Sequence, residues 1–404
     1  MSSAGSGRIY FTRSLVAPIS FASVLREPIG KQSEVLDESV KGLYRSASRF
    51  LFNDSLDSRL TFTYLGCEIA TMPMTGDGSL GRVRLDYFVI ENSFHETVTL
   101  DIHVLVERNE YSLSELIVST DNLVRAKHSS VIGFMYDLYW GSDEIVEAFP
   151  TLGRWEHALR EHLGDRIPSK YLYVSICDQD AEVIVNWEKY SSLIYGLLFL
   201  HREGVDAELA SGYLEGHIWG STEFFRNFSQ PGAIVSVSRP YPSQIYDANR
   251  EYFLPSQGSL PCTRALPRES SMFETYDLLP EYPPLRYCGL LVGLYSGWIE
   301  EVMRSVETRL FRIHDSSRWL YPLRVWRGSA RLQSEFYRAR YSDAIRLPVV
   351  RDYVSRLVEE KQLGPTGENI RDLQASSLNL ILLIIGGLSA ILGVLGVLIA
   401  IFGH

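Results

Sequence analysis

Hydrophobic and polar positions alternate along residues 96–108, where every second residue from Val98 to Val106 is aliphatic. A period of two predicts a β-strand with one apolar face. Residues 59–69 and 82–91 have a similar mixture of apolar and polar residues. They flank the glycine-rich sequence MPMTGDGSLG. We therefore expect this part of the chain to form a β-sheet, with the glycines in a hairpin loop.

Beyond this sheet, segments with helical spacing alternate with short continuous apolar runs. The predicted helices are residues 114–139, 143–149, 152–165 and 187–204, and the predicted strands are residues 170–178 and 232–238. Together with the first sheet they predict a mixed α+β or α/β domain over residues 1–239. Proline, glycine and serine cluster in residues 240–284, which predicts a long irregular connection.

A helical region rich in arginine is expected over residues 285–365. Its helices are predicted at residues 285–313, 329–345 and 349–362. Gly289, Gly293 and Gly297 lie on one face of the first helix. The uncharged stretch around them is too short to cross a bilayer, so we expect these glycines to pack within the soluble part of the protein.

The segment 366–404 is the most apolar part of the chain. It has no Asp, Glu, Lys or Arg after Asp372. Residues 378–402 would form a helix about 37 Å long, which crosses a hydrocarbon core of about 30 Å once. We therefore expect a single C-terminal transmembrane helix, the alternatives being a buried core helix or an amphipathic surface helix.

Small residues interrupt this helix with a period of seven, in two series that lie three residues apart. The two series are Asn379, Gly386, Gly393 and Ala400, and Ser389, Gly396 and Gly403. In lipid, helices associate through close backbone approach and polar contacts, which small residues permit. A strict seven-residue repeat predicts a left-handed crossing. We expect a homo-oligomer packed along this stripe. The alternative is that glycine is simply common in transmembrane helices, and the sequence leaves open whether a bundle encloses a pore.

The flanking charges predict the orientation of the helix. Four basic residues precede it, and His404 follows it; the four are Arg351, Arg356, Lys361 and Arg371. The positive-inside rule then places the large N-terminal part in the cytoplasm. The first 25 residues are only weakly apolar, so we expect them to belong to the mature protein and not to a signal peptide.

The net charge of −10 argues against binding of duplex nucleic acid, but arginine is concentrated in one stretch. Residues 318–356 contain nine arginines and three acidic residues, a balance of +6, so the rest of the chain sums to −16. Arginine binds phosphate in a bidentate way and stacks on aromatic rings. The candidate ligand-binding residues are Arg318, Arg324, Arg327, Arg331, Arg338, Arg340, Trp319 and Trp326. The expected partner is an anionic small molecule, such as a nucleotide, or an anionic lipid head group. The alternative is charge bias beside a membrane, with the arginines pairing to the acidic domain.

The sequence contains no recognisable catalytic constellation. The GDGSLG sequence matches a dinucleotide fingerprint only by its letters, because a strand and not a helix follows it. His95 and His103 have no acidic partner that the sequence identifies, and the four cysteines are widely spaced. We therefore expect no enzyme activity, no metal and no cofactor.

The leading hypothesis is an oligomeric, single-pass membrane protein whose cytoplasmic domain senses a ligand and acts through its helix bundle. Its sharpest form is a gated channel or a membrane-disrupting effector of a defence or stress system. The alternatives are an anchored scaffold without channel activity and, less favoured, a membrane-tethered enzyme. The layout loosely resembles that of CorA-type magnesium channels, but those have two membrane helices and a Gly-Met-Asn motif between them. Both are missing here, so the resemblance implies no residue roles.

Overall fold

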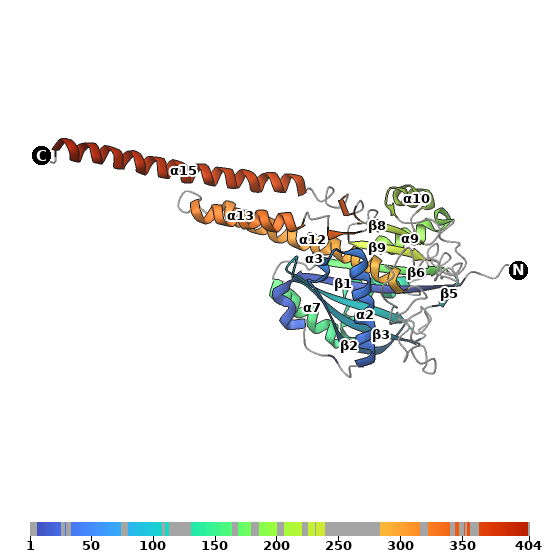
Figure 1. Cartoon of the computed structure of the whole chain (residues 1–404). Coiled ribbons are helices and arrows are strands. Elements are labelled where there is room, and N and C mark those ends of the chain that lie inside the picture. Colours follow the sequence, from blue (N-terminus) through green and yellow to red (C-terminus); the bar gives the residue numbers. More distant parts are fainter. Residues whose placement is uncertain are drawn as a thin grey trace. The chain divides into compact units, whose positions relative to one another are not determined.

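The computed structural model shows a mixed α+β protein (Figure 1). It describes residues 6–25, 29, 34–73, 80–106, 110–112, 131–163, 169–178, 186–199, 206–219, 225–230, 232–238, 283–315, 322–339, 344–346, 351, 354–355 and 363–402. The chain divides into two compact units. The first, the α+β unit, comprises residues 1–298 and 342–354, and the second, the helical unit, comprises residues 299–341 and 355–404.

One mixed sheet of nine strands organises the α+β unit, in the order β2-β3-β4-β1-β6-β9-β8-β7, with β5 also paired to β1. The strands are β1 (Ser6–Pro18), β2 (Leu60–Pro73), β3 (Leu80–Asn92), β4 (Thr97–Val106), β5 (Glu110–Ser112), β6 (Ser169–Asp178), β7 (Ile218–Trp219), β8 (Phe225–Gln230) and β9 (Ala233–Ser238). All pairings are antiparallel except that of β6 with β9, which is parallel.

The strands expected within residues 59–108, 170–178 and 232–238 are confirmed as β2, β3, β4, β6 and β9. Pro73 pairs with Leu80 across the end of β2 and β3, so the glycine-rich sequence connects a β-hairpin, as predicted. The loop itself lies outside the described residues, as do residues 113–130 and the proline-rich residues 240–282.

The central strand β1 was not predicted from the sequence. Phe11 is paired with Val104 of β4 on one side and with Val174 of β6 on the other. Its side chains alternate between the two sheet faces, and from Phe11 to Ala17 both sets are buried. Because both faces are covered, polar residues such as Arg13 and Ser14 are buried beside apolar ones, and the period of two is hidden.

One face of the sheet carries the main hydrophobic core. Phe11, Leu15, Leu100 and Val174 belong to one cluster with Trp155, and the helices nearby contribute the rest of it. The short helices and the helices after β5 are η1 (Ile19–Phe21), α1 (Ala22–Leu25), α5 (Val131–Trp140), α6 (Asp143–Ala148), α7 (Pro150–Leu163), η2 (Trp187–Tyr190), α9 (Ser191–Phe199) and α10 (Ala207–Glu215). The helices expected near residues 143–149, 152–165 and 187–204 are therefore confirmed.

The opposite face of the sheet is covered by α2 (Glu34–Leu51) and by the first half of α12 (Pro283–Asp315). Trp298 of α12 donates a hydrogen bond from its indole to Thr99 Oγ1 at 2.8 Å. A Cβ added to Gly289 would lie 2.7 Å from the hydroxyl of Tyr173, and one added to Gly293 would lie 2.2 Å from the ring of Tyr171. The glycines of α12 thus let the helix approach the tyrosines of β6, which agrees with the expectation that these glycines serve close packing.

Replacing Gly293 with alanine is expected to lower the free energy of unfolding of the α+β unit by about 1–3 kcal/mol, because the added methyl group overlaps the buried ring of Tyr171. Gly212 in α10 is a matched control, since a Cβ there meets no atom within 4 Å. Gly212→Ala should instead stabilise by up to about 1 kcal/mol, because alanine favours the helix. Denaturant unfolding of the full chain in detergent, followed by tryptophan fluorescence, tests both. Equal effects of the two substitutions would contradict the close approach of α12.

A returning segment completes the α+β unit. Residues 342–354, which we call the strap, follow part of the helical unit in sequence but belong to the α+β unit. Ile345 forms a β-bridge with Phe52, Asn53 donates its amide to the Ala344 carbonyl, and Arg346 donates its amide to the Leu51 carbonyl.

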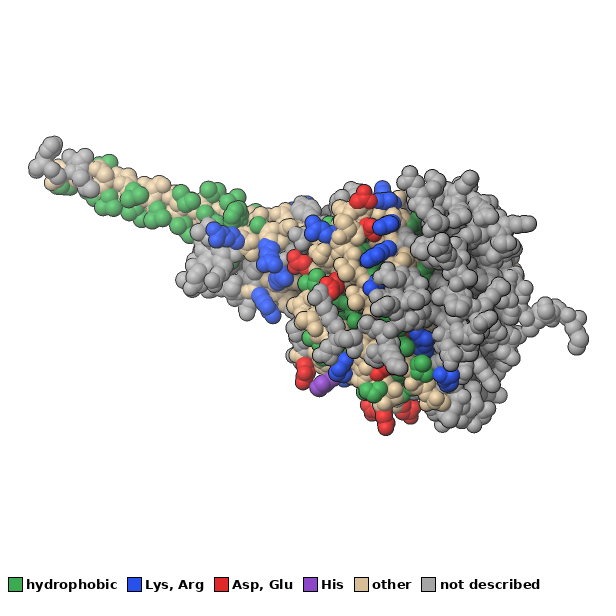
Figure 2. All heavy atoms as spheres, turned by 60° about the horizontal axis from the view of Figure 1, so that its bottom comes forward, with side chains coloured by type: hydrophobic (Ala, Val, Ile, Leu, Met, Phe, Trp, Pro, Cys, Tyr) green, Lys and Arg blue, Asp and Glu red, His purple; other side chains and the backbone are tan. Residues whose placement is uncertain are grey.

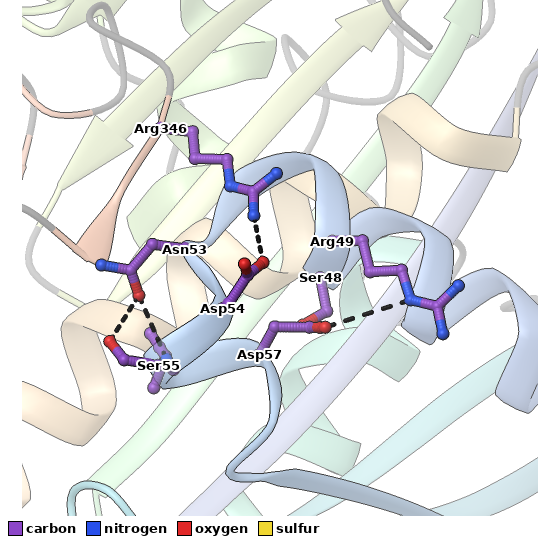
Figure 3. Close-up of polar contacts among 8 residues, drawn as sticks. Ser48, Arg49, Asn53, Asp54, Ser55, Asp57 and Arg346 are labelled. Carbon is purple, nitrogen blue, oxygen red and sulfur yellow. Dashed lines mark hydrogen bonds and ion pairs between the residues drawn. The ribbon is translucent and has the colours of Figure 1, made fainter. Parts of the chain in front are cut away.

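Side chains add to this contact at α3 (Asp54–Asp57) (Figure 3). The guanidinium of Arg346 pairs with the Asp54 carboxylate, and Asn53 caps α3 by accepting the Leu56 amide. Ser48 and Arg49 of α2 reach Asp57. The strap is therefore fixed by backbone hydrogen bonds, with a solvent-exposed ion pair beside them.

Candidate functional site

The helical unit contains α13 (Pro322–Ala339) and α15 (Leu363–Phe402), which pack against each other. Near the start of α15 one face is buried, at Gly367, Ile370, Leu373 and Ser377. A Cβ on Gly367 would lie 2.8 Å from the ring of Phe336. Small and aliphatic residues at spacings of three and four therefore give this first part of α15 an ordinary amphipathic packing face.

The remainder of α15 differs from this first part in its exposure to solvent. Every residue from Leu382 to Leu398 is exposed, and Figure 2 shows the apolar side chains along the projecting helix in green. Among the described residues, α15 alone has a long apolar window, within Gly367–Leu398, with a mean hydropathy of 2.7 and none of the window buried. Soluble proteins rarely expose an apolar surface of this extent. The helix is long and apolar enough to cross a membrane.

The small-residue stripe runs along this exposed part. Asn379 and Ser389 are exposed, and a Cβ built at Gly386, Gly393 or Gly396 would meet no atom within 4 Å. The side chain of Ala400 and the whole of Gly403 lie outside the described residues. Within the described chain, nothing covers the stripe, so it is open to another helix.

Three of the eight predicted anion-binding side chains are described. Arg327 and Arg331 are exposed on α13, and Trp326 beside them is partly buried. Arg324 and Arg338 lie in α13, but their side chains are outside the description, and Arg318, Trp319 and Arg340 lie wholly outside the described residues. A ligand site formed by all eight therefore remains a prediction.

The structure adds a buried polar cluster that the sequence analysis missed. Ser14 and Tyr44 both donate hydrogen bonds to the Asp101 carboxylate, which is 0% exposed. His103 Nε2 lies 2.6 Å from the Tyr44 hydroxyl and 3.2 Å from Asp101 Oδ2. The statement that His103 has no acidic partner is therefore wrong. An Asp-x-His sequence places both side chains on one face of a strand, and that spacing was the available signal.

A second buried group lies on the same face. The Arg84 guanidinium binds the Asp86 carboxylate through two hydrogen bonds, at 2.9 and 2.8 Å, and Tyr64 donates a third at 2.8 Å. Burial raises the pKa of Asp86, while the charge of Arg84 opposes that shift. Burial also raises the pKa of Tyr64, and the negative charge of Asp86 adds to this effect.

A third buried ionic contact lies on the other face of the sheet, within the main core. Arg13 is 0% exposed, pairs with Glu156 of α7 and donates to the Leu138 carbonyl at 2.8 Å. Lys170 on the neighbouring strand donates to the Tyr139 carbonyl at 3.0 Å. Burial, and then the charge of Arg13, lowers the pKa of Lys170 to about 8.

These three polar groups have the features of structural networks. The side chains of Ser14, Tyr44, Asp101 and His103 are all 0% exposed beneath α2 and α12, so no substrate reaches them. Their hydrogen bonds satisfy polar groups that would otherwise be costly to bury. Within the described ranges, no group of three or more His, Cys, Asp or Glu is arranged to hold a metal ion.

The exposed length of α15 is thus the feature with the clearest functional chemistry, because it presents a surface that water does not solvate well. Comparisons of the chain with protein families, with curated proteins and with solved structures find no match.

Proposed function

We propose that this protein is a single-pass membrane protein that self-associates through α15 and uses the resulting helix bundle as a pore controlled by the α+β unit. The observation that carries the proposal is the exposed, uncharged run from Leu382 onward. In a bilayer this run is solvated by acyl chains, so its exposure no longer costs free energy. The α+β unit, with its net acidic sequence, stays in water on the cytoplasmic side.

Continuity of α15 supports the coupling between the two parts. One uninterrupted helix runs from Leu363 to Phe402, so the segment packed on α13 and the apolar segment form a single rod. The strap, which precedes this helix in the chain, is fixed to α2 and α3 of the α+β unit. A change in the α+β unit at the strap therefore has a short covalent route to the membrane helix, through residues 355–362.

Self-association follows from the chemistry of the stripe. An isolated Gly-rich helix face offers little contact to lipid, but it lets a second backbone approach closely. Ser389 and Asn379 add hydrogen-bonding groups at the same face. The proposed pore requires several copies of α15 around a common axis, with Ser389 and Asn379 supplying polar groups toward that axis.

Gly393→Leu is expected to weaken association of the full chain in detergent by about tenfold or more, equivalent to at least about 1.4 kcal/mol, because the larger side chain separates the helices. Gly387→Leu is the matched control. It makes the same change one residue away from the stripe, where a Cβ also meets no atom of the described chain. Analytical ultracentrifugation measures association, and ion flux from liposomes measures conduction.

The expected pattern is loss of association and of flux in Gly393→Leu, with both retained in Gly387→Leu. Release of the wild-type protein from membranes by alkaline carbonate would contradict membrane insertion itself. Retained association with no flux from wild-type liposomes, with or without added nucleotides, would reject the pore and favour an anchored scaffold.

A further inference from the structure

The helical unit has a second feature besides the apolar run, which is positive charge at one end of α13. Residues 308–315 at the end of α12 and residues 322–333 at the start of α13 contain five arginines and one acidic residue, Asp315. Arg312 and Arg327 are exposed. By contrast Arg304, further from this end, is paired with Glu300 and Glu301. Within the part of the chain that the structure describes, neither Arg312 nor Arg327 has an ion-pair partner.

The contact between α13 and α15 fixes where this end lies along the membrane helix. Phe336, near the end of α13, meets Gly367, near the start of α15, so the two helices run antiparallel. Pro322 lies 14 residues before Phe336 in the chain, so its level on α15 is Ile381, which lies 14 residues after Gly367. Arg327 is level with Ser376 by the same count.

The length of the exposed run gives the membrane boundary. Leu382–Phe402 is about 31 Å long at 1.5 Å per residue, which matches a hydrocarbon core of about 30 Å. The boundary of the core therefore falls close to Leu382, at the level where α13 begins. The head-group region adds roughly 5–8 Å on each side. Arg327 lies about 9 Å above Leu382, at the outer edge of this region.

The residues at this level are of types that are common at membrane interfaces. Trp326 is partly buried beside Arg327, and tryptophan is enriched at membrane interfaces. Arginine near a bilayer surface gains about 1 kcal/mol from anionic lipid, and its long side chain can reach the phosphates.

We propose that the arginine-bearing ends of α12 and α13, at Arg312 and Arg327, form a docking surface for the head groups of anionic phospholipids. This inference rests on the proposed membrane insertion of α15 and adds a lipid partner to it. Lipid binding at this level holds the helical unit against the bilayer and sets the depth of the apolar run. Lipid is the expected ligand because the contact between α13 and α15 brings Arg327 to the head-group layer. Arg312 is included because the end of α12 is joined to the start of α13 by only residues 316–321.

The test uses the full chain in detergent with phosphatidylglycerol, with bound lipid counted by native mass spectrometry. The Arg312→Gln/Arg327→Gln variant is expected to bind phosphatidylglycerol about tenfold or more weakly than the wild type, with binding of phosphatidylcholine unchanged. The matched control is Arg45→Gln/Arg59→Gln, which removes the same charge from exposed positions of the α+β unit and should leave lipid binding unchanged.

Carbonate extraction of the same proteins separates the two proposals. A wild-type protein that resists extraction, together with equal lipid binding by the two double variants, would overturn the docking surface and leave the membrane span in place. Release of the wild type by carbonate would reject the span. Displacement of phosphatidylglycerol by millimolar inorganic phosphate would show a site for soluble anions and would also overturn the lipid assignment.

Discussion

Asp101→Ala is expected to destabilise the α+β unit by about 4 kcal/mol, one of the two largest effects of a single substitution predicted for this chain. Asp101 accepts hydrogen bonds from Ser14 and Tyr44 and lies 3.2 Å from His103. All four side chains are fully buried. Without the carboxylate, the hydroxyl groups of Ser14 and Tyr44 lose this buried acceptor, and each such loss costs about 1–3 kcal/mol.

The measurement is denaturant unfolding of the full chain in detergent, with near-ultraviolet circular dichroism reporting the packing of Tyr44 and Tyr287, whose rings lie 4.8 Å apart. Asp54→Ala is the control, since Asp54 is 97% exposed and its pairing with Arg346 is a surface contact of small effect. A similar loss of stability in both variants would show that the hydrogen bonds of Asp101 do not hold α2 on the sheet.

Glu156→Ala is expected to cost about 3–5 kcal/mol, because it leaves the guanidinium of Arg13 buried without a counter-charge. The double variant Arg13→Met/Glu156→Leu should recover most of this loss. It replaces both members of the pair with apolar side chains of similar size, and such exchanges are often close to neutral. Some loss remains, since the Leu138 carbonyl no longer receives the hydrogen bond of Arg13.

Thermal unfolding of the wild type, Arg13→Met, Glu156→Leu and the double variant forms a complete cycle, and Glu156→Ala is measured beside it. The expected result is that the double variant is more stable than Glu156→Ala alone. If the double variant is no more stable than the single one, then the buried positive charge is not the source of the effect, and packing around α7 is.

Strands with at least one wholly apolar face were predictable from the sequence, and a strand with polar side chains on both faces was not. β4 shows a clear alternation, because Val98, Leu100 and Ile102 enter the main core while Thr99 and Asp101 face α2 and α12. β1 has polar side chains on both faces, including Arg13 and Ser14, and these are satisfied only by partners distant in sequence. A pattern of hydrophobicity carries no information about such partners.

The helix α2 was missed although its sequence has a helical pattern. Leu43, Ala47 and Leu51 are buried at a spacing of four residues, and Tyr44 and Ser48 add polar groups to the same face. By contrast, α15 was predictable in its type and extent, since absence of charge over so many residues depends on no tertiary partner. The helix begins earlier than the predicted apolar segment, at Leu363, because its first turns pack on α13.

The candidate site was also predictable only in part from the sequence. Positions of the glycine stripe follow from the seven-residue period alone, and the described members are indeed exposed on one continuous helix. The arginines were found by composition, but the level of Arg327 relative to the apolar run of α15 needed the contact between Phe336 and Gly367. Sequence spacing within α13 does not reveal which of its ends lies near the apolar run.

The strap also has a consequence for how the protein is made. In the sequence, the α+β unit is interrupted by helices of the helical unit. The last part of the α+β unit is the strap, which pairs with Phe52 and Asn53. A ribosome synthesises the strap before it synthesises the apolar run of α15. All parts of the α+β unit are thus synthesised before the exposed apolar run of α15, so the chain can bury its largest core first.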